Sequence, residues 1–338
     1  MLASRILSPE MQDLIQKRNS QVIAISDLPI EWTCINGIPL SFTHDVCRMP
    51  ETPFHGLMSF YAANNTVEYS IPKNILSKTL VILGSQDSPF LFWHDRVHES
   101  ATLHNFRTEK CTALAQLKSA IEKHRPELLI FDCHGGVDEE TKSTFLWIGD
   151  QKLTGQYAIE HSIYAPIVFI SACGTAPTYG AYNSIANAFF EAGALATTTT
   201  YIPIGIDSGS FLYLRILEKL AFIADNVIHK NWLEFICHVI RTSTMSDTYL
   251  KLLNNCTFTR DEFIKSQTQA VQNSLFFSKR RDLYGELDRH IQSLTRDKKM
   301  HYSETVPEYL LYSTLGRADL IIFENWREKF IELNSPEP

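Results

Sequence analysis

Short apolar runs alternate with amphipathic stretches through the middle of the chain. Runs of apolar, often β-branched residues that stop at a polar residue or a glycine predict buried strands. Five such runs occur, over residues 79–83, 128–133, 145–148, 167–172 and 195–201. Between the first two, Leu114, Leu117 and Ile121 recur at helical spacing, and Thr108 is the expected cap of that helix. Alternating strands and helices, with strands apolar on both faces, predict an α/β fold: a mainly parallel sheet with helices on both faces.

The regions on either side of this segment have different patterns. Residues 1–75 are mixed, whereas residues 226–338 are mainly helical. In the second region, a capping-box pattern at 259–262 predicts the start of a long helix, and 319–323 predict one more short strand. The sequence thus predicts three parts: an N-terminal mixed segment, an α/β core over 76–225 and a helical C-terminal region.

Composition and charge fit a globular protein of ordinary surface. The chain has 338 residues, of which 44% are hydrophobic and 20% charged, and its formal charge is −7. A disordered chain is excluded, and no global field attracts nucleic acid or an anionic membrane. No run reaches the roughly 18 apolar residues that a membrane span needs. Polar residues interrupt the first dozen positions, so we expect no secretory signal.

Cysteine usage and the basic clusters refine this picture. The seven cysteines are scattered and odd in number, with no CxxC pair, which is typical of free thiols in a reducing cytoplasm. Basic residues gather at 279–281 and 296–299, where acidic neighbours dilute their charge. We interpret both clusters as solvated helix faces and expect no direct nucleic-acid contact. The sequence therefore favours a cytoplasmic globular protein.

A histidine and a cysteine stand at the ends of two predicted strands. His134 ends the run that contains Asp132, Cys173 ends the run that contains Ser171, and each is followed by glycine. Ligands of parallel sheets bind beyond the carboxyl ends of the strands. Because side chains alternate along a strand, Asp132 and His134 share one face, as do Ser171 and Cys173, while Cys133 points the other way. If the strands are neighbours in register, about 4.8 Å apart, His134 and Cys173 meet at the sheet edge.

A thiol and an imidazole in this arrangement can perform nucleophilic acyl transfer. The thiolate attacks a carbonyl, the imidazolium protonates the leaving amine, and the backbone N–H groups of Gly135 and Cys173 can stabilise the oxyanion. Buried cysteines and strand-end histidines are more often packing residues, and spacing alone leaves that alternative open. A zinc site is disfavoured because Cys133 and His134 point apart and no second metal-spaced pair follows, so no metal or cofactor is expected.

Four segments follow one another in an order that adds to this interpretation. They are HGG at 134–136, FLWIGDQKLTGQYA at 145–158, VFISACGTAPTYG at 168–180 and NAFFEAGALATTTTYIPI at 187–204. This set resembles the CHAT domain, the caspase- and separase-like family of bacterial cysteine peptidases in clan CD. The resemblance implies a caspase-type fold, a catalytic dyad of His134 and Cys173, and oxyanion donors at Gly135 and Cys173. Asp132 is expected either to orient the His134 ring or to be a turn carboxylate.

The sequence departs from the family pattern after the last predicted strand of the core. The family has a segment like Trp-Pro-Val-Asp-Asp there, whereas this chain has YIPIGID at 201–207. By the resemblance, Asp207 lines a specificity pocket, although capping of the next helix explains an acid at this place nearly as well. The resemblance also places Ser171 at the border of that pocket. No tetratricopeptide array is present, so regulation is expected from the flanking segments or from a partner protein.

The leading hypothesis is a cytoplasmic cysteine endopeptidase with a narrow protein substrate, acting as a regulated bacterial effector in defence or cell death. Two other classes stay open. One is a catalytically silent caspase-like scaffold, against which the presence of both His134 and Cys173 argues. The other is a thiol amidase or acyltransferase on a small molecule, which a deep closed pocket would favour over an open groove.

Overall fold

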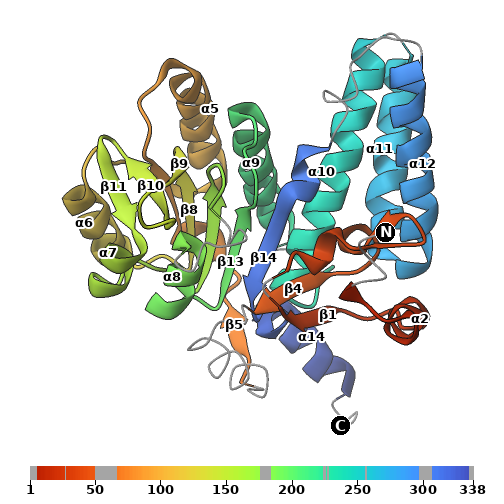
Figure 1. Ribbon diagram of the computed structural model, residues 1–338, viewed down its shortest axis with the longest axis horizontal. Coiled ribbons are helices and arrows are strands. Elements are labelled where there is room, and N and C mark those ends of the chain that lie inside the picture. The colour runs from red at the N-terminus through yellow and green to blue at the C-terminus, as the bar shows by residue number, and fades with distance from the viewer. Residues whose placement is uncertain are drawn as a thin grey trace. The chain divides into compact units, whose positions relative to one another are not determined.

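The structure is a computed structural model in which the chain divides into two compact units (Figure 1). It describes residues 6–26, 28–49, 67–175, 184–223, 226, 228–255, 257–296 and 307–334. The larger unit comprises Ile23–Leu28, Cys47–Phe235 and Tyr312–Pro338, and the smaller unit comprises Met1–Val22, Pro29–Val46 and Ile236–Leu311. Each unit has its own core, and the two are described separately.

An eight-stranded sheet forms the centre of the larger unit. In order across the sheet, the strands are β1 (Val22–Ile25), β4 (Val46–Met49), β14 (Tyr312–Gly316), β13 (Ala196–Thr200), β12 (Ile167–Ser171), β8 (Leu128–Asp132), β6 (Thr79–Leu83) and β7 (Arg107–Lys110). The five strands from β13 to β7 run parallel, whereas β14 pairs antiparallel with β13. The predicted fold class, a mainly parallel sheet with helices, is confirmed.

Helices cover both faces of this sheet (Figure 1). The strands β6, β8 and β12 are buried along their whole length, because their apolar side chains face helices on either side. One face packs against α6 (Leu114–His124), α7 (Gly155–Glu160) and α8 (Ile185–Ala192) in a single apolar cluster. The other face carries α5 (Ser88–His104) and α9 (Ile206–Ile223), which pack against each other.

Two smaller sheets complete the larger unit. A three-stranded antiparallel sheet consists of β9 (Gly135–Val137), β10 (Thr144–Ile148) and β11 (Gln151–Thr154), and it follows β8 directly in the chain. A two-stranded sheet pairs β5 (Tyr69–Ile71) with β15 (Ile321–Phe323), after which α14 (Glu324–Asn334) ends the described chain.

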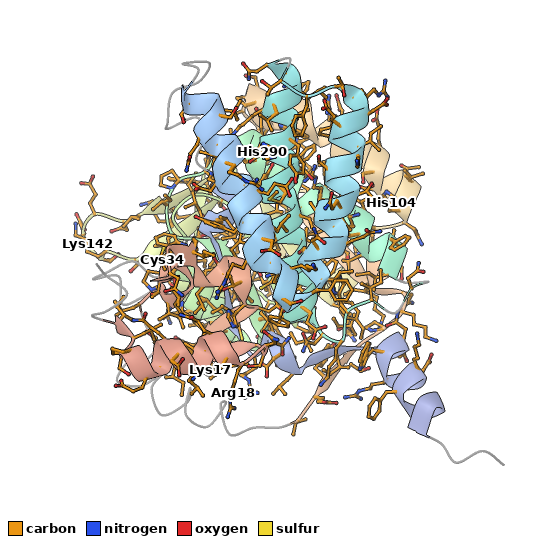
Figure 2. The ribbon with its side chains drawn as sticks, turned by 90° about the vertical axis from the view of Figure 1, so that its right-hand side faces the viewer. Lys17, Arg18, Cys34, His104, Lys142 and His290 are labelled. Carbon is orange, nitrogen blue, oxygen red and sulfur yellow. The ribbon has the colours of Figure 1, made fainter. Side chains whose placement is uncertain are left out.

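The smaller unit is mainly helical. It contains α2 (Pro9–Lys17), α3 (Leu40–Thr43), most of α10 (Trp232–Asn254), α11 (Arg260–Leu275) and α12 (Phe277–Arg296), together with the short pair β2 (Cys34–Ile35) and β3 (Ile38–Pro39). Figure 2 shows α10, α11 and α12 side by side, with His290 labelled on α12. The capping box at Thr259 and Glu262 is present as predicted, because each side chain accepts from the other residue's backbone N–H.

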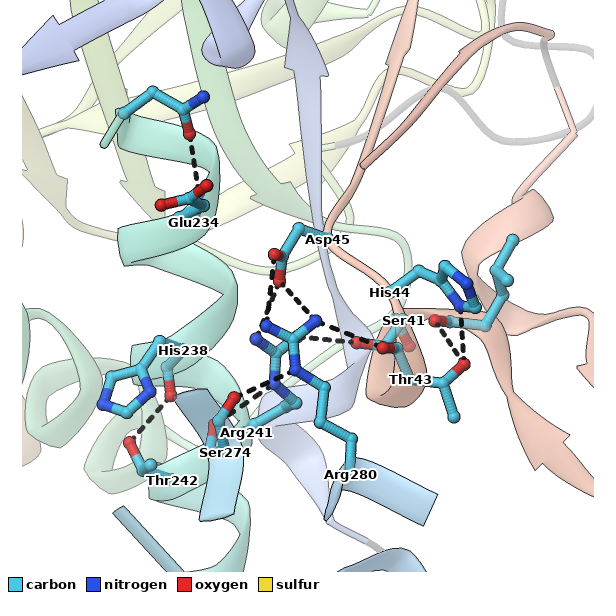
Figure 3. A network of polar contacts seen from close by, with 12 residues as sticks. Ser41, Thr43, His44, Asp45, Glu234, His238, Arg241, Thr242, Ser274 and Arg280 are labelled. Atoms are coloured by element: carbon cyan, nitrogen blue, oxygen red, sulfur yellow. Dashed lines mark hydrogen bonds and ion pairs between the residues drawn. The ribbon is translucent and has the colours of Figure 1, made fainter. Parts of the chain in front are cut away.

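A buried ion-pair network holds the smaller unit together (Figure 3). Asp45 is fully buried between two guanidinium groups: Arg241 donates to Oδ1 over 2.7 Å and Arg280 donates to Oδ2 over 3.3 Å. The carboxylate thereby links the segment after α3 to α10 and α12. The interpretation of 279–281 as a solvated face is wrong for Arg280, whose charge is matched inside the core, and correct for the exposed Lys279 and Arg281.

Several predicted elements take a different place from the one expected. Thr108 lies in β7 and does not cap a helix, because α6 begins later, at Leu114 behind Ala113. The run at 145–148 is a strand of the three-stranded sheet and not of the central one. The strand expected over 319–323 begins at Ile321. In the basic cluster at 296–299, residues 297–299 lie outside the described residues. Residues 176–180, the end of the segment VFISACGTAPTYG, also lie outside them.

Within the described part of the chain, no helix has the length and apolarity needed to cross a bilayer.

Candidate active site

The pairing of β8 with β12 aligns the two candidate catalytic residues. The strands are parallel neighbours, and their last paired positions are Asp132 and Ser171. Just beyond them, the N–H of Cys133 donates to the Ser171 carbonyl over 3.4 Å. His134 and Cys173 each follow that last pair by two residues, just past the ends of the two strands, and neighbouring strands are spaced about 4.8 Å apart. The strands β8 and β12 are therefore neighbours in the register that the sequence predicts for aligning His134 with Cys173.

The alternation of side chains around the site is also as predicted. Cys133 and Ala172 point into the cluster beneath α6, α7 and α8. On the other face, Asp132 accepts from the hydroxyl of Tyr213 on α9 over 2.8 Å. A β-carbon placed on Gly209 of α9 would lie 2.5 Å from the Ser171 hydroxyl oxygen. The face that holds Asp132 and Ser171 is thus the α9 face.

His134 is held by the loop after β6 and the first turn of α5. Its Nε2 lies 2.6 Å from Oδ2 of Asp87, the residue that precedes α5. Its backbone N–H donates to the Ser85 hydroxyl over 3.1 Å, and its ring packs edge-to-face on Phe90 with centroids 4.8 Å apart. These contacts fix both the position and the orientation of the imidazole, while Nδ1 makes no hydrogen bond with the described residues.

Cys173 lies in a tight turn after β12. Gly174 has φ of +58°, a left-handed conformation that favours glycine. The next residue, Thr175, returns to the sheet, where its N–H donates to the Thr200 carbonyl over 3.0 Å. The half-buried Cys173 thiol donates to the carbonyl of Ile204, at 3.5 Å, in the loop that leads into α9.

Gly135 lies directly against the cysteine turn. A side chain at this position would collide with the carbonyl oxygen of Cys173 and come within 2.9 Å of the Thr175 methyl group. The turns that follow β8 and β12 therefore touch through their backbones, and only glycine fits at this contact.

Asp132 takes a different position from the one expected of a ring-orienting carboxylate. It is 1% exposed, its described partner is Tyr213, and its Oδ1 has no hydrogen-bond partner among the described residues. Burial raises the pKa of Asp132 to about 7, although the Tyr213 hydroxyl opposes this shift. The carboxylate that contacts His134 is Asp87, because the ring lies past the strand end while Asp132 is still within the covered strand.

Asp207 lies in the first turn of α9, which begins at Ile206. Its Oδ1 accepts from the indole Nε1 of Trp93 on α5 over 2.6 Å, and the residue is exposed. Asp207 lies one residue inside the helix and not at the capping position, so it does not cap α9. Its side chain contacts Trp93 instead. The predicted pocket residue thus joins the N-terminal parts of α5 and α9.

Four side chains follow four consecutive parallel strands at one edge of the sheet. In the strand order β13, β12, β8 and β6, the segments after the strands carry Asp207 (in the first turn of α9), Cys173, His134 and Asp87. Of these four residues, Asp87 is the one that the sequence motifs did not indicate. The available signal was the segment SQDSP, in which Asp87 precedes Ser-Pro at a helix start directly after a buried strand.

Among the described residues, no group of three or more His, Cys, Asp or Glu side chains is arranged to hold a metal ion.

Comparison with known families and structures agrees with this geometry. Residues 91–223 match the CHAT domain family. The resemblance carried by the sequence motifs is confirmed, and the CHAT domain includes His134, Cys173 and Asp207, while Asp87 lies just before it. No curated protein matches this chain.

Two solved structures have a similar fold. The Arg-specific cysteine proteinase gingipain R has a TM-score of 0.55 and 12% identity, covering 95% of this chain and 70% of that chain. The complex of the RgpB pro- and mature domains from Porphyromonas gingivalis has a TM-score of 0.53 and 12% identity, covering 95% and 71%. The central sheet with its helices is therefore the caspase-like fold of these cysteine proteinases.

Proposed function

We propose that the chain is a cysteine endopeptidase in which Cys173 is the nucleophile and His134 the general acid and base. The observation that carries this proposal is the register of β8 with β12, in which Asp132 pairs with Ser171 and leaves both reactive side chains two residues beyond. We assign the peptidase core to residues 76–225, around the match to the CHAT domain.

The chemistry follows from these two groups. The Cys173 thiolate attacks the scissile carbonyl carbon, and the carbonyl π electrons move to oxygen in a tetrahedral intermediate. The intermediate collapses to a thioester as the C–N bond breaks and the His134 imidazolium gives its proton to the leaving amine. Water then attacks the thioester, His134 takes the proton, and the carboxylic acid leaves as the thiolate re-forms.

Asp87 is the positioning residue for this histidine. Its carboxylate oxygen accepts from Nε2–H, which leaves Nδ1 for proton transfer. Phe90 supports the same ring orientation through its edge-to-face contact.

The oxyanion donors are the backbone N–H groups of Gly135 and Cys173. The close approach of their two turns supports this assignment, because it places the backbone of Gly135 directly beside that of Cys173. Donors fixed by the backbone in this way need no reorganisation when charge develops on the carbonyl oxygen.

The exposure of the site favours a protein chain over a small enclosed substrate. The side chain of His134 is 45% exposed and that of Asp87 is 61% exposed. The four loops follow one another along an open sheet edge, over which an extended peptide can lie. A small-molecule amidase would instead need a closed pocket around the thiol. We infer a specific protein substrate. We also infer that the chain is a cytoplasmic bacterial effector, as the sequence predicts, and that a partner protein controls its activity.

The acid at the start of α9 suggests the substrate residue before the cut bond. Asp207 follows Ile204, whose carbonyl contacts the Cys173 thiol, by three residues, and we place the small hydroxyl of Ser171, which lies against Gly209 of α9, at the border of the same pocket. A carboxylate there favours an Arg or Lys side chain, with Arg able to form a bidentate contact. Gingipain R, which has a similar fold, is itself Arg specific.

Mapping of new protein termini tests the proposed function. Cells that express the wild type and cells that express Cys173→Ala are compared by mass spectrometry of protein N-termini. We expect a small set of termini that occurs with the wild type alone. Identical sets in the two strains would contradict a peptidase with this nucleophile.

A further inference from the structure

The strand that follows the candidate catalytic histidine lies at an edge of its sheet. β9 begins directly after His134 and is the outermost strand in the order β11, β10, β9, so that among the described strands it pairs with β10 alone. Its two glycines are partly exposed, and Val137 is 50% exposed. An edge strand presents backbone N–H and C=O groups with which another extended chain can pair.

The hydrogen bonds at the two ends of β9 show which backbone groups face outward. The His134 carbonyl accepts from an N–H of β10 over 2.9 Å, and the Asp138 N–H donates to the carbonyl of Ser143, just before β10, over 2.8 Å. In an antiparallel pair, residues that bond to the partner strand alternate with residues that do not. The N–H and C=O groups of Gly135 and Val137 therefore point away from β10, toward the outer edge.

These outward groups are available for a ligand. In the described part of the chain, the backbone N–H and C=O of Gly135 and Val137 have no hydrogen-bond partner. The Gly135 N–H is also the group assigned above to the oxyanion. The open edge of β9 thus begins at the place where the scissile carbonyl would lie and continues for one more pair of backbone groups, at Val137.

The side of the nucleophile on which β9 lies determines which part of a substrate it can meet. In the strand order β13, β12, β8, the segments after the strands carry Asp207, Cys173 and His134. Under the proposed function, the side chain before the cut bond reaches Asp207, and the leaving amine takes its proton from His134. The residues after the cut bond therefore leave the nucleophile on the side of β8, where the chain continues into β9.

We propose that the outer edge of β9 binds the substrate residues after the cut bond as an added parallel strand. The ligand is an extended polypeptide, recognised through its backbone. The oxyanion accepts from the Gly135 N–H. The second residue after the cut donates its N–H to the Gly135 carbonyl, and its own carbonyl accepts from the Val137 N–H, as in a parallel ladder. This subsite rests on the proposed peptidase and names the part of the substrate that its site holds.

Single-atom changes in a peptide substrate test the first of these bonds. The probe copies about ten residues around a cut site found by mapping of protein termini. One version replaces the N–H of the second residue after the cut with an ester oxygen. A matched version carries the ester at the third residue, whose N–H points away from β9 in a parallel strand. We expect kcat/KM to fall about fivefold with the first ester and less than about twofold with the second.

Equal kcat/KM for the all-amide probe and the second-residue ester would overturn the proposal, as would equal losses with the two esters. Both outcomes require cleavage of the probe, so they contradict the subsite and leave the peptidase intact. Identical sets of termini from the wild type and Cys173→Ala would instead contradict the peptidase itself.

Val137→Pro tests the second bond. It removes the outward N–H and leaves the ladder to β10 in place, because this N–H does not face β10. The probe is compared with a shorter one that ends as a dimethylamide at the first residue after the cut. We expect the wild type to cleave the long probe about tenfold faster than the short one, and Val137→Pro about threefold faster. Partial unfolding lowers both rates alike and leaves their ratio unchanged.

Val137→Ala is the matched control, because it removes the side chain and keeps the N–H. It should retain most of the tenfold difference between the two probes. The same ratio in the wild type and Val137→Pro would overturn the assignment of the Val137 N–H. Equal cleavage of the long and short probes by the wild type would overturn the subsite as a whole.

Discussion

The carboxylate of Asp87 and the ring of His134 meet at 2.6 Å although 47 residues separate them in the chain. The contact arises because β6 and β8 are parallel neighbours, with Leu83 opposite Asp132, so that the loops after both strands leave the same edge. The next strand in the sheet, β12, adds Cys173 to this edge. The candidate site is thus a property of strand order, which brings three separate loops together.

Asp87→Asn should lower kcat about tenfold and change KM little. The amide can present an N–H group to Nε2 where the carboxylate presents only acceptors, so the ring loses its preferred tautomer and orientation, while substrate contacts are kept. Steady-state kinetics on a peptide substrate measure the effect. Asp95→Asn, which removes an exposed carboxylate from the same helix, serves as the control. Equal loss in both variants would argue against a positioning role.

Asp132 should make the stability of the larger unit depend on pH. Its pKa is near its usual value of 3.8 in the unfolded chain and about 7 in the folded one, so ionisation is penalised by folding. Asp132 therefore lowers the free energy of unfolding progressively as the pH rises from about 4 to 7. Because one pKa unit corresponds to about 1.4 kcal/mol, the total loss is up to roughly 4 kcal/mol.

Asp132→Asn removes this penalty and can still accept from Tyr213. Urea unfolding at pH 5 and pH 8 is the measurement. We expect the variant to gain stability relative to the wild type as pH rises, with the larger gain at pH 8. A difference between the proteins that does not change with pH would show that Asp132 does not titrate in this window.

Asp207→Asn should reduce kcat/KM for substrates with Arg or Lys before the cut bond, by about fivefold. The effect is modest because the carboxylate is exposed, and an exposed ion pair contributes at most about 1 kcal/mol. Substrates with Leu or Ala at that position should be unaffected. A peptide library measures both, and Glu218→Gln, further along α9, is the control. An unchanged preference, or a wild-type preference for acidic residues, would exclude the pocket role.

Asp45→Asn should destabilise the smaller unit by about 3 kcal/mol or more. The change leaves two buried guanidinium groups, of Arg241 and Arg280, without their counter-charge (Figure 3). Asp247→Asn, which breaks a half-exposed pair with Lys251, should cost less than about 1 kcal/mol. Denaturant unfolding compares the two variants. Similar losses would show that burial of the Asp45 network contributes little.

The sequence predicted the features that depend on local pattern. Runs of apolar residues predicted β6, β8 and β12, and alternation within a strand separated Cys133 from Cys173 correctly. The capping box of Thr259 and Glu262 could be predicted because its two residues are three positions apart in the sequence. Local periodicity determines all of these features, and the fold class follows from their order.

The features that were missed depend on contacts between distant segments. Nothing near Asp87 predicts that its loop lies beside that of His134, because the neighbour relation of β6 and β8 is not local. Arg280 resembled a solvated cation, since the buried Asp45 that balances it is 235 residues away. Asp132 is on the predicted face, but the helix that covers it could not be identified from its own neighbourhood.

Cleavage of one identified substrate protein by purified variants tests the central claim most directly. Cys34 is exposed, Cys133 is buried and Cys173 is half-buried, so a single set of Cys→Ala variants separates accessibility from catalysis. We predict that Cys34→Ala and Cys133→Ala keep cleavage, that Cys173→Ala abolishes it, and that His134→Ala lowers it by about a hundredfold or more. Full cleavage by Cys173→Ala, or its loss in Cys34→Ala or in a folded Cys133→Ala, would contradict the assignment of Cys173 as the nucleophile.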